Sequence, residues 1–472
     1  MSNLAATAGL DALARHVQRD LELLDYPRRP WLEPRRAASG ESIYDVIIVG
    51  GGQSGLTAAF GLLRERVTNL LVLDQNPLDR AGPWLNFARM RTLRTPKYLT
   101  GPDLGIPSLT PRAWYEAQFG GGSWEALGLL PKELWASYLA WYRETLHIPV
   151  QPNTAVGALG YDAAAHHFLV PCTTSEGGRT LRARRVVLAT GIDGSGEWRV
   201  PQSVSDALPK RLYAHTREDI DFEALRGKRI AVLGAGASGF DNASSALDLG
   251  AAEVQLFFRR PQQVVVNPYR WAEFVGFLKH HADLPDPEKW RFILQILRMG
   301  QLPPKDTLLR AQAHAGFHLH AGAGWKSIRA RGETVLIETE SGRFEVDFVI
   351  IATGCVTDLS ARPELVHFEA HIARWADRYT PPSAESHEDL LRHPYLGAGF
   401  EFTERHAGEA PYLAHLYNYT FGGLLSMGFG GASISGLKYS APRLVAGITR
   451  SLFLEDSVAH FDSLCHYAEP EF

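Results

Sequence analysis

Cysteine is scarce in this sequence. Of its 472 residues only three are cysteines, Cys172, Cys355 and Cys465, and they are widely separated. They form neither a CxxC pair nor a spacing typical of metal ligands, which argues against a disulfide framework and a dithiol relay and suits a reducing compartment. The segment HAGFHLH would place His318 and His320 on one strand face. Without a nearby carboxylate or cysteine ligand, these histidines do not predict a metal site, and we expect none.

A strong charge of either sign and a long apolar helix are also missing. The formal net charge is −4, so no basic field indicates nucleic acid or an anionic membrane as a partner. Ala410–Leu437 has no charged side chain and is long enough to span a bilayer, but Pro411, Asn418 and many glycines interrupt it. Charged residues from Asp11 onward interrupt the N-terminal apolar positions, so no signal peptide is expected. The expectation is a cytoplasmic enzyme.

Residues 1–41 are expected to precede the main domains. Apolar residues within 3–25 are spaced by threes and fours from Leu10 onward, which predicts a helix with one apolar face. The segment YPRRPWLEPRR (Tyr26–Arg36) then ends the helix with prolines. We favour a solvated linker for this arm, and the alternative is an arm that wraps a neighbouring domain or subunit. A homo-oligomer is compatible with the sequence, which does not define the oligomeric state.

A first glycine loop lies in DVIIVGGGQSGLTAA. Gly50, Gly52 and Gly55 follow the apolar strand Val46–Val49 with the spacing GxGxxG. In such a loop the first glycine allows a tight turn, the second lets a pyrophosphate approach the backbone, and the third lets helix and strand pack closely. Asp74 ends the next strand, where a carboxylate accepts hydrogen bonds from ribose hydroxyls and repels a 2′-phosphate. This loop therefore predicts FAD or NAD(H), and not NADP(H).

A second glycine loop lies in GKRIAVLGAGASGFDNA. Gly234, Gly236 and Gly239 repeat the spacing after another apolar strand. Here the following strand ends in Arg259 and Arg260 instead of an acid, and two guanidiniums at that position suit a 2′-phosphate. The second loop therefore predicts NADPH, with a resident FAD on the first loop. The alternatives are a loop that binds nothing and arginines that only face solvent.

Each half of the chain also holds an apolar strand that ends in ATG. These are RRVVLATGI (Arg184–Ile192) and DFVIIATGC (Asp347–Cys355). The repetition predicts an α/β protein with two Rossmann-like dinucleotide-binding domains. We expect residues 42–205 and 346–472 to form the FAD domain. Residues 206–345 are expected to form the NADPH domain, with an aromatic insert at 262–320.

On these motifs the sequence resembles the single-component NADPH-dependent flavin monooxygenases, which include flavin-containing, Baeyer–Villiger and N-hydroxylating monooxygenases. AGPW (Ala81–Trp84) is similar to the segment that lies against the flavin in that family. The two ATG strands look like the family's hinge strand out of the FAD domain and its return strand, so the resemblance implies an NADPH domain inserted into the FAD domain. The run from Tyr213 to Ala243 is similar to the family's motif around the second loop, with matches at His215, Ser238 and Asp241. MRTLRTPK (Met90–Lys97) loosely resembles the flavin-facing segment of the N-hydroxylases.

The match to each subclass is incomplete. Pro209 and Arg211 stand where the flavin-containing and Baeyer–Villiger fingerprints have Phe and Gly, and Asp219 stands where they have an aromatic residue. Cys355 follows the second ATG, where N-hydroxylases often have Tyr. The resemblance therefore supports the family and no single subclass.

The resemblance implies a monooxygenase. In that family NADPH reduces the flavin, the reduced flavin captures O2 as a C4a-(hydro)peroxide, and one oxygen atom passes to a small organic substrate. We expect N- or S-oxygenation in preference to carbonyl oxygenation. The alternatives are an FAD-dependent NADPH reductase or oxidase without oxygen insertion, and a non-catalytic flavin redox sensor. The predicted cofactor-binding residues are Gly50, Gly52, Gln53, Ser54, Gly55, Asp74, Gln75, Trp84, Met90, Arg91, Thr190, Gly191, Gly234, Gly236, Ala237, Ser238, Gly239, Arg259, Arg260, Thr353 and Gly354.

No nucleophile–base pair stands out, and the cofactor chemistry requires none. Gln53, Lys97 and His215 are candidates for catalytic side chains, and each has a structural alternative: loop packing, a surface amine and a loop histidine. The aromatic insert is expected to control substrate choice as a pocket lid, or else to bury a helical subdomain. Its aromatic residues are Tyr269, Trp271, Phe274, Phe277 and Trp290. The glycine-rich segment Phe421–Gly436 is expected to bring its backbone close to the flavin ring, or else to pack tightly.

Overall fold

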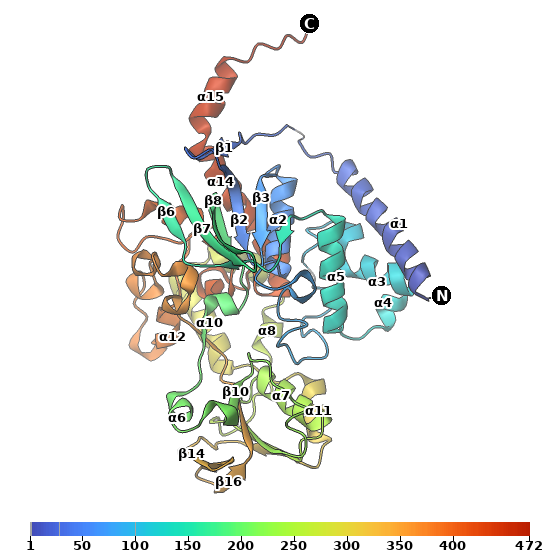
Figure 1. Ribbon diagram of the computed structural model, residues 1–472, viewed down its shortest axis with the longest axis vertical. Helices are drawn as coiled ribbons and strands as arrows, with labels where there is room; N and C mark the ends of the chain where they lie inside the picture. Colours follow the sequence, from blue (N-terminus) through green and yellow to red (C-terminus); the bar gives the residue numbers. More distant parts are fainter. Residues whose placement is uncertain (1, 28, 100) are drawn as a thin grey trace.

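The computed structural model describes residues 2–27, 29–99 and 101–472. Met1, Arg28 in the predicted arm, and Thr100 lie outside the described residues. Figure 1 shows two α/β bodies, one above the other, with the N-terminal and C-terminal segments both on the upper body. We call the upper body the first domain and the lower body the second domain.

The first domain is built on a sheet in the order β4-β3-β2-β8-β7-β5, with β19 added to β8 and β6 added to β7. Strands β2, β3, β4, β8 and β19 are parallel, and β7 returns antiparallel to β8. The apolar strand Ser42–Val49 is buried in the middle, as a strand covered on both faces must be. The strands are β1 (Arg35–Arg36), β2 (Ser42–Val49), β3 (Leu70–Leu73), β4 (Val150–Gln151), β5 (Ala155–Val156), β6 (Gly160–Asp162), β7 (His167–Thr174), β8 (Gly177–Leu188) and β19 (Leu416–Asn418).

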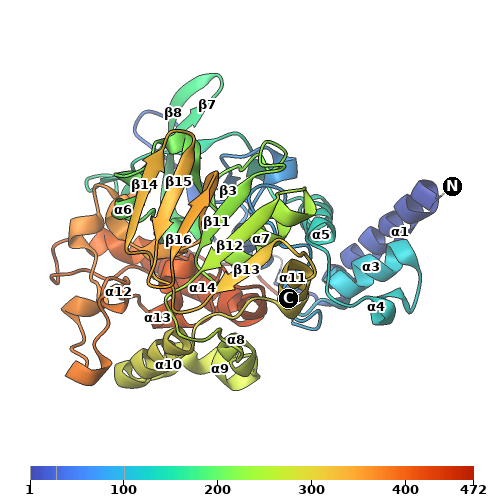
Figure 2. The same cartoon turned by 90° about the horizontal axis from the view of Figure 1, so that it is seen from below.

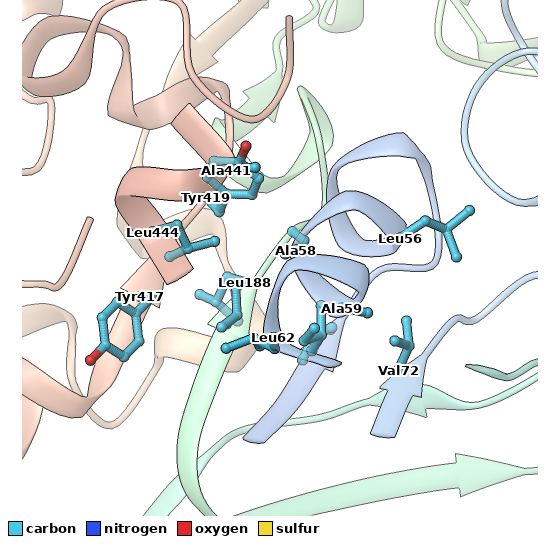
Figure 3. Close-up of a cluster of buried hydrophobic side chains, with 14 of the residues drawn as sticks. Leu56, Ala58, Ala59, Leu62, Val72, Leu188, Tyr417, Tyr419, Ala441 and Leu444 are labelled. Atoms are coloured by element: carbon cyan, nitrogen blue, oxygen red, sulfur yellow. The ribbon is translucent and has the colours of Figure 1, made fainter. Parts of the chain in front are cut away.

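Helices from both ends of the chain cover this sheet. Helix α2 (Gln53–Arg64) packs against the C-terminal helix α14 (Ile434–Glu455), and Figure 3 shows their apolar side chains meeting those of β8 and β19. Helix α1 (Ser2–Leu23) packs against α3, and the tryptophans of this region are core residues. The remaining helices here are α3 (Pro111–Phe119), α4 (Ser123–Ala126), α5 (Lys132–Thr145) and α15 (Ser457–Cys465).

The second domain holds a parallel sheet in the order β10-β17-β11-β12-β13. Helices α7 (Ala237–Asp248) and α11 (Lys305–Gln312) cover one face, and an antiparallel sheet of β14 to β16 covers the other. Figure 2 shows this second sheet beside β11 and β12. The strands are β10 (Tyr213–His215), β11 (Arg229–Leu233), β12 (Glu253–Phe257), β13 (Phe317–His320), β14 (Ser327–Arg331), β15 (Thr334–Glu338), β16 (Arg343–Val346) and β17 (Phe348–Ile351).

The two domains are joined by a short antiparallel ribbon. Strand β9 (Gly196–Trp198) leads out of the first domain and pairs with β18 (Cys355–Thr357), which leads back. The predicted insertion of one dinucleotide-binding fold into another is therefore present. Strand β17, which the predicted boundary at 346 assigns to the FAD domain, pairs with β10 and β11 of the second domain. The chain therefore returns after Ile351, because the second sheet needs this strand between β10 and β11.

The aromatic insert forms a helical layer. Helices α8 (Pro268–Trp271), α9 (Val275–His280) and α10 (Asp286–Met299) pack against residues 375–429 in an aromatic core that buries Phe277 and Trp290. Tyr269 stacks on Phe429, whereas Trp271 and Phe274 remain exposed. Short helices α6 (Gln202–Ser205), α12 (Glu388–Leu391) and α13 (Leu424–Met427) complete the fold. None of the helices in the described part of the chain has the length and apolarity needed to cross a bilayer.

The N-terminal arm lies on the first domain. The Trp31 indole donates to the carbonyl oxygen of Glu65 at 2.8 Å, and Arg35 forms ion pairs with Glu455 and Asp456. The described part of the arm therefore wraps its own domain, which differs from the favoured interpretation of a solvated linker. The difference follows from the acids at the end of α14, which a linear pattern does not place beside the arm.

Two buried arginines anchor the same helix end. Arg184, on β8, is 1% exposed and lies 3.1 Å from Asp45 and 2.8 Å from Asp456. Neighbouring Arg185 pairs with Glu455 at 2.7 Å. Burial raises the pKa of Asp45, and the Arg184 guanidinium opposes that rise. The network ties the end of α14 to the base of the sheet.

We predict that Arg184→Met lowers the free energy of unfolding by about 3–5 kcal/mol, because it leaves the buried Asp45 carboxylate without its ion-pair partner. The measurement is chemical denaturation at neutral pH. The control is Arg331→Met, whose exposed pair with Glu345 should contribute no more than about 1 kcal/mol. Equal effects of the two substitutions would contradict this account of the network.

Candidate functional site

The first glycine loop connects β2 to α2, and two of its glycines are required by the backbone itself. Gly50 has φ +110°, and a Cβ there would stand 2.5 Å from the carbonyl oxygen of Ala189. A Cβ at Gly55 would stand 1.8 Å from the carbonyl oxygen of Gly50. At Gly52 the nearest atom to a Cβ would be Gly82 Cα at 3.7 Å, so space remains in front of the α2 N-terminus. Free N–H groups at that terminus favour an anionic group.

A cavity of about 780 Å³ opens at this loop. It extends from Asp74 at the end of β3 past the glycines to Met90 and Arg94. Most of the residues predicted to bind the first nucleotide line it: Gly50, Gly52, Gln53, Ser54, Asp74, Gln75, Trp84, Met90, Thr190 and Gly191. Gly55 and Arg91 do not: Gly55 packs beneath the loop, and Arg91 turns outward to Asp248. The structure thus brings together segments that are far apart in the sequence.

Asp74 is oriented by its own loop. One carboxylate oxygen accepts a hydrogen bond from the Gly51 N–H at 2.7 Å, and the other accepts from the Asn76 N–H at 2.8 Å. The side chain is buried and lines the cavity. Each oxygen keeps a second acceptor position, so the carboxylate is suited to ribose hydroxyls.

Two buried polar atoms in the cavity wall have no partner among the described residues. They are Trp84 Nε1 and Thr190 Oγ1. Buried polar groups are nearly always hydrogen-bonded, so these atoms point to a polar ligand. The Ser54 hydroxyl donates to the carbonyl oxygen of Gly431, and Ala432 also lines the cavity. The glycine-rich segment therefore brings its backbone to the cavity, and the residues present fit a dinucleotide such as FAD.

Two buried histidines support that glycine-rich segment. His281 Nε2, from the helical insert, lies 3.2 Å from the carbonyl oxygen of Leu425, and His393 Nδ1 lies 3.0 Å from that of Gly422. Burial lowers the pKa of each histidine to about 4, so both are neutral at physiological pH. No aromatic residue of the insert lines the cavity in the described part of the chain. The insert acts on the cavity through this segment and is not a lid over it.

The candidate catalytic residues lie in three different environments. Gln53 lines the cavity, and its amide oxygen accepts a hydrogen bond from the Trp135 indole at 3.2 Å. Lys97 instead donates to the carbonyl oxygens of Trp124 and Leu127 at the end of α4, outside the cavity lining. The alternative of a surface amine does not describe this contact either. The contact depends on where the short helix α4 ends, which the sequence pattern does not show.

His215 lies beside the hinge ribbon. It is buried at the end of β10, and its ring packs against Trp198 of β9 at 5.4 Å between centroids. Nδ1 accepts a hydrogen bond from the Arg217 N–H at 3.1 Å, so the neutral ring carries its proton on Nε2. Burial lowers the pKa to about 4. This environment suits a side chain that shapes the hinge.

The second glycine loop repeats the geometry of the first. Gly234 has φ +117°, and a Cβ there would lie 2.4 Å from the carbonyl oxygen of Ala352. A Cβ at Gly239 would lie 2.1 Å from the Gly234 carbonyl oxygen, whereas Gly236 has no neighbour closer than 3.9 Å. Ala237 and Ser238 begin α7 directly behind it. Across the sheet Gly354 has φ +82°, and the Thr353 hydroxyl donates to the carbonyl oxygen of Arg199 in the hinge region.

The two arginines after β12 have different environments. Arg260 donates to the carbonyl oxygens of Arg298 at 3.0 Å and Met299 at 3.4 Å, and so caps the C-terminus of α10. Arg259 is exposed, and its side chain has no partner among the described residues. Arg259 is therefore the guanidinium available to a 2′-phosphate, while Arg260 is committed to the helical layer.

Sequence reasoning missed the charged side chains that line the cavity from scattered positions. Arg217 forms a two-pronged pair with Asp193 at 2.7–3.0 Å and lies over the Phe87 ring at 4.1 Å. Arg362 is paired with Glu364 at 2.9 Å. No local motif marks these residues, because they meet only through the hinge ribbon and the folded loops.

Redox and metal chemistry by side chains finds no support in the part of the chain that the structure describes. The three cysteines are free thiols, Cys172 buried, Cys355 partly buried and Cys465 exposed. No three His, Cys, Asp or Glu side chains of the described residues are grouped to hold a metal ion. The site depends instead on backbone cradles, carboxylates and guanidiniums.

Comparisons with known proteins agree with this architecture. Residues 44–276 match the pyridine nucleotide-disulphide oxidoreductase family. An FAD-dependent urate hydroxylase from Xanthomonas campestris is 44% identical over 463 residues, which cover 98% of this chain and 97% of that protein. Among solved structures, an ornithine N-hydroxylase from Kutzneria has a TM-score of 0.68 at 16% identity, covering 87% of this chain and 99% of that one. The ornithine hydroxylase from Pseudomonas aeruginosa also has a TM-score of 0.68, at 14% identity, covering 87% and 100%. The predicted fold class is confirmed.

We predict that Gly52→Ala and Gly55→Ala separate ligand binding from folding. At Gly52 a Cβ fits the protein but intrudes where a pyrophosphate would lie, so FAD affinity should fall about 10–100-fold, as expected for about 1–3 kcal/mol of overpacking. At Gly55 the Cβ meets backbone, so the fold itself should lose stability. Flavin titration and thermal unfolding of the apoprotein measure the two effects. Full flavin affinity in the Gly52 variant would exclude this loop as the cradle.

Proposed function

Because the chain belongs to the family of the FAD-dependent urate hydroxylase from Xanthomonas campestris, we propose that it is an FAD-dependent monooxygenase that uses NADPH and O2 to hydroxylate a urate-like heterocycle. Membership makes the chain a flavin-dependent oxidoreductase. The substrate class, the carbon-centred reaction and the use of NADPH are our proposals. The use of NADPH is supported by the pair of glycine loops joined by one hinge ribbon, with a carboxylate after the first loop and Arg259 after the second. The substrate class and the carbon-centred reaction rest on the 44% identical relative.

The proposed reaction is balanced when one molecule of each reactant is consumed. Substrate, NADPH, O2 and a proton yield hydroxylated substrate, NADP⁺ and water. Bound FAD would supply the acceptance of hydride and the activation of O2, which no side chain provides. The chain's own residues orient the nucleotides through the α2 and α7 N-termini, hold a ribose on Asp74, and close one side of the cavity with the segment around Gly431.

N- or S-oxygenation, favoured by the sequence, becomes the second candidate. The ornithine hydroxylases support it through the fold alone, whereas the 44% identical relative is named for urate. A reductase of the dithiol type is disfavoured by the free cysteines. The cytoplasmic location and a homo-oligomer stay predictions of the sequence.

The test is NADPH oxidation by the purified, FAD-loaded protein in air, with urate, ornithine, an organic sulfide or no substrate. We expect urate to stimulate oxidation of NADPH and to disappear in equal amount, with one atom of labelled O2 in the product. Stimulation by an amine or a sulfide alone would favour the second candidate. Reduction of the flavin without any oxygen incorporation would reject a monooxygenase.

We also predict that Arg259→Gln raises the KM for NADPH about 10–100-fold and leaves the KM for NADH unchanged, because a charge-assisted hydrogen bond to the 2′-phosphate is lost. The matched control is Arg260→Gln, which should lower thermal stability with the same proportional effect on both nucleotides. Steady-state kinetics with each nucleotide measures the preference. An unchanged NADPH preference in the Arg259 variant would reject this residue as the phosphate site.

A further inference from the structure

Three arginines of one irregular segment reach across the domain boundary. Arg89, Arg91 and Arg94 follow the AGPW segment in the first domain and meet acids of the second domain. We call them the arginine bracket. Arg89 lies 3.6 Å from the Asp219 carboxylate, Arg91 lies 2.7 Å from Asp248, and Arg94 is paired with Asp241; these three partners are carried by the β10–β11 connection and by α7. The bracket thus joins the flavin-side segment to the helix that begins at the second glycine loop.

Arg94 differs from the other two because its partner is buried. The Asp241 side chain is only 3% exposed, and its other oxygen accepts a hydrogen bond from the Thr307 hydroxyl at 3.2 Å. Burial raises the pKa of Asp241, and the Arg94 guanidinium opposes that rise. Two elements of the second domain, α7 and α11, therefore determine where this guanidinium lies.

Arg94 is also the member of the bracket that lines the flavin cavity. The hydrogen bond to Asp241 uses Nη2 alone, and the described residues provide no partner for Nε or Nη1. Its side chain is 31% exposed and lines the cavity. At least two N–H donors of a planar fork therefore stay free on a guanidinium that lines the cavity.

The other cavity arginines are less available. Arg217 and Arg362 are each held by a two-pronged contact with a carboxylate of the cavity wall. Arg80 lies in the short turn after β3, close in the chain to Asp74, which suits the ribose and pyrophosphate side of a dinucleotide. Arg94 combines a position fixed by Asp241 with free donors.

We propose that Arg94 binds the anionic carbonyl edge of the substrate and that Asp241 is its positioning residue. The inference rests on the proposed function, since urate is a monoanion at neutral pH and presents adjacent carbonyl and ring-nitrogen acceptors. A guanidinium fork forms two parallel hydrogen bonds with such an edge. Because Asp241 belongs to α7, the substrate site is complete only when the second domain presents Asp241 to Arg94.

The first test compares Arg94→Gln with Arg91→Gln. Both remove a bracket arginine paired with α7, but Arg91 is outside the cavity. We expect the KM for urate to rise at least about tenfold in the Arg94 variant, from the loss of a charge-assisted pair, and to stay unchanged in the Arg91 variant. FAD content and the flavin midpoint potential should match wild type in both. Arg94→Lys keeps the charge without the fork and should recover part of the affinity even if Arg94→Gln folds poorly.

The second test is a double-mutant cycle with Asp241→Asn. A positioning role predicts that Asp241→Asn raises the KM for urate and adds little to Arg94→Gln in the double variant. Thr307→Val, which removes only the hydroxyl contact, should act in the same direction with a smaller effect and serves if Asp241→Asn does not fold. Additive effects of Asp241→Asn and Arg94→Gln would overturn the positioning role.

The outcomes separate the two proposals. A wild-type enzyme that does not oxidise NADPH with urate overturns the proposed function and this inference together. An active wild-type enzyme with an unchanged urate KM in the Arg94 variants overturns the inference alone. A shifted flavin potential with an unchanged urate KM would assign Arg94 to the cofactor and also overturn it.

Discussion

Backbone crowding at two glycines is the constraint on which this structure depends. In each domain the third glycine of the loop faces the carbonyl oxygen of the first so closely that an added Cβ would stand 1.8 Å from it at Gly55 and 2.1 Å from it at Gly239. The close packing lets α2 and α7 begin directly behind the loop, with free N–H groups facing the ligand. The same geometry, used twice, yields two cradles in one chain.

The way in which the two domains are joined determines how the two nucleotide loops can act together. The hinge ribbon β9–β18 joins the domains, and charged pairs cross between them at Asp193–Arg217 and Asp241–Arg94. Each pair has its acid in one domain and its arginine in the other. Both arginines line the cavity at the first glycine loop. The cavity therefore depends on the seating of the second domain, as expected where a reduced nucleotide must meet a flavin.

Much of the fold and part of the site were predictable from the sequence, because glycine loops are local chemistry. Gly52 and Asp74 stand out by spacing alone, and the insertion of one domain into another follows from the family resemblance of the two ATG strands. The sequence assigned Arg260 to the 2′-phosphate, whereas its side chain caps α10, because the position where that helix ends cannot be read from the sequence. The contact of Lys97 with the end of α4 could not be predicted either, because it also depends on where a helix ends. The predicted domain boundary at residue 346 places strand β17 in the wrong domain, because the sequence of an apolar strand does not show which sheet it joins.

The most direct measurement is the structure of the protein crystallised with FAD and NADP⁺. The account predicts the FAD ribose on Asp74, the FAD pyrophosphate over Gly52, and the 2′-phosphate of NADP⁺ within hydrogen-bond distance of Arg259. NADP⁺ bound in the cavity at the first glycine loop would contradict this account. So would a second glycine loop that stays empty at saturating nucleotide.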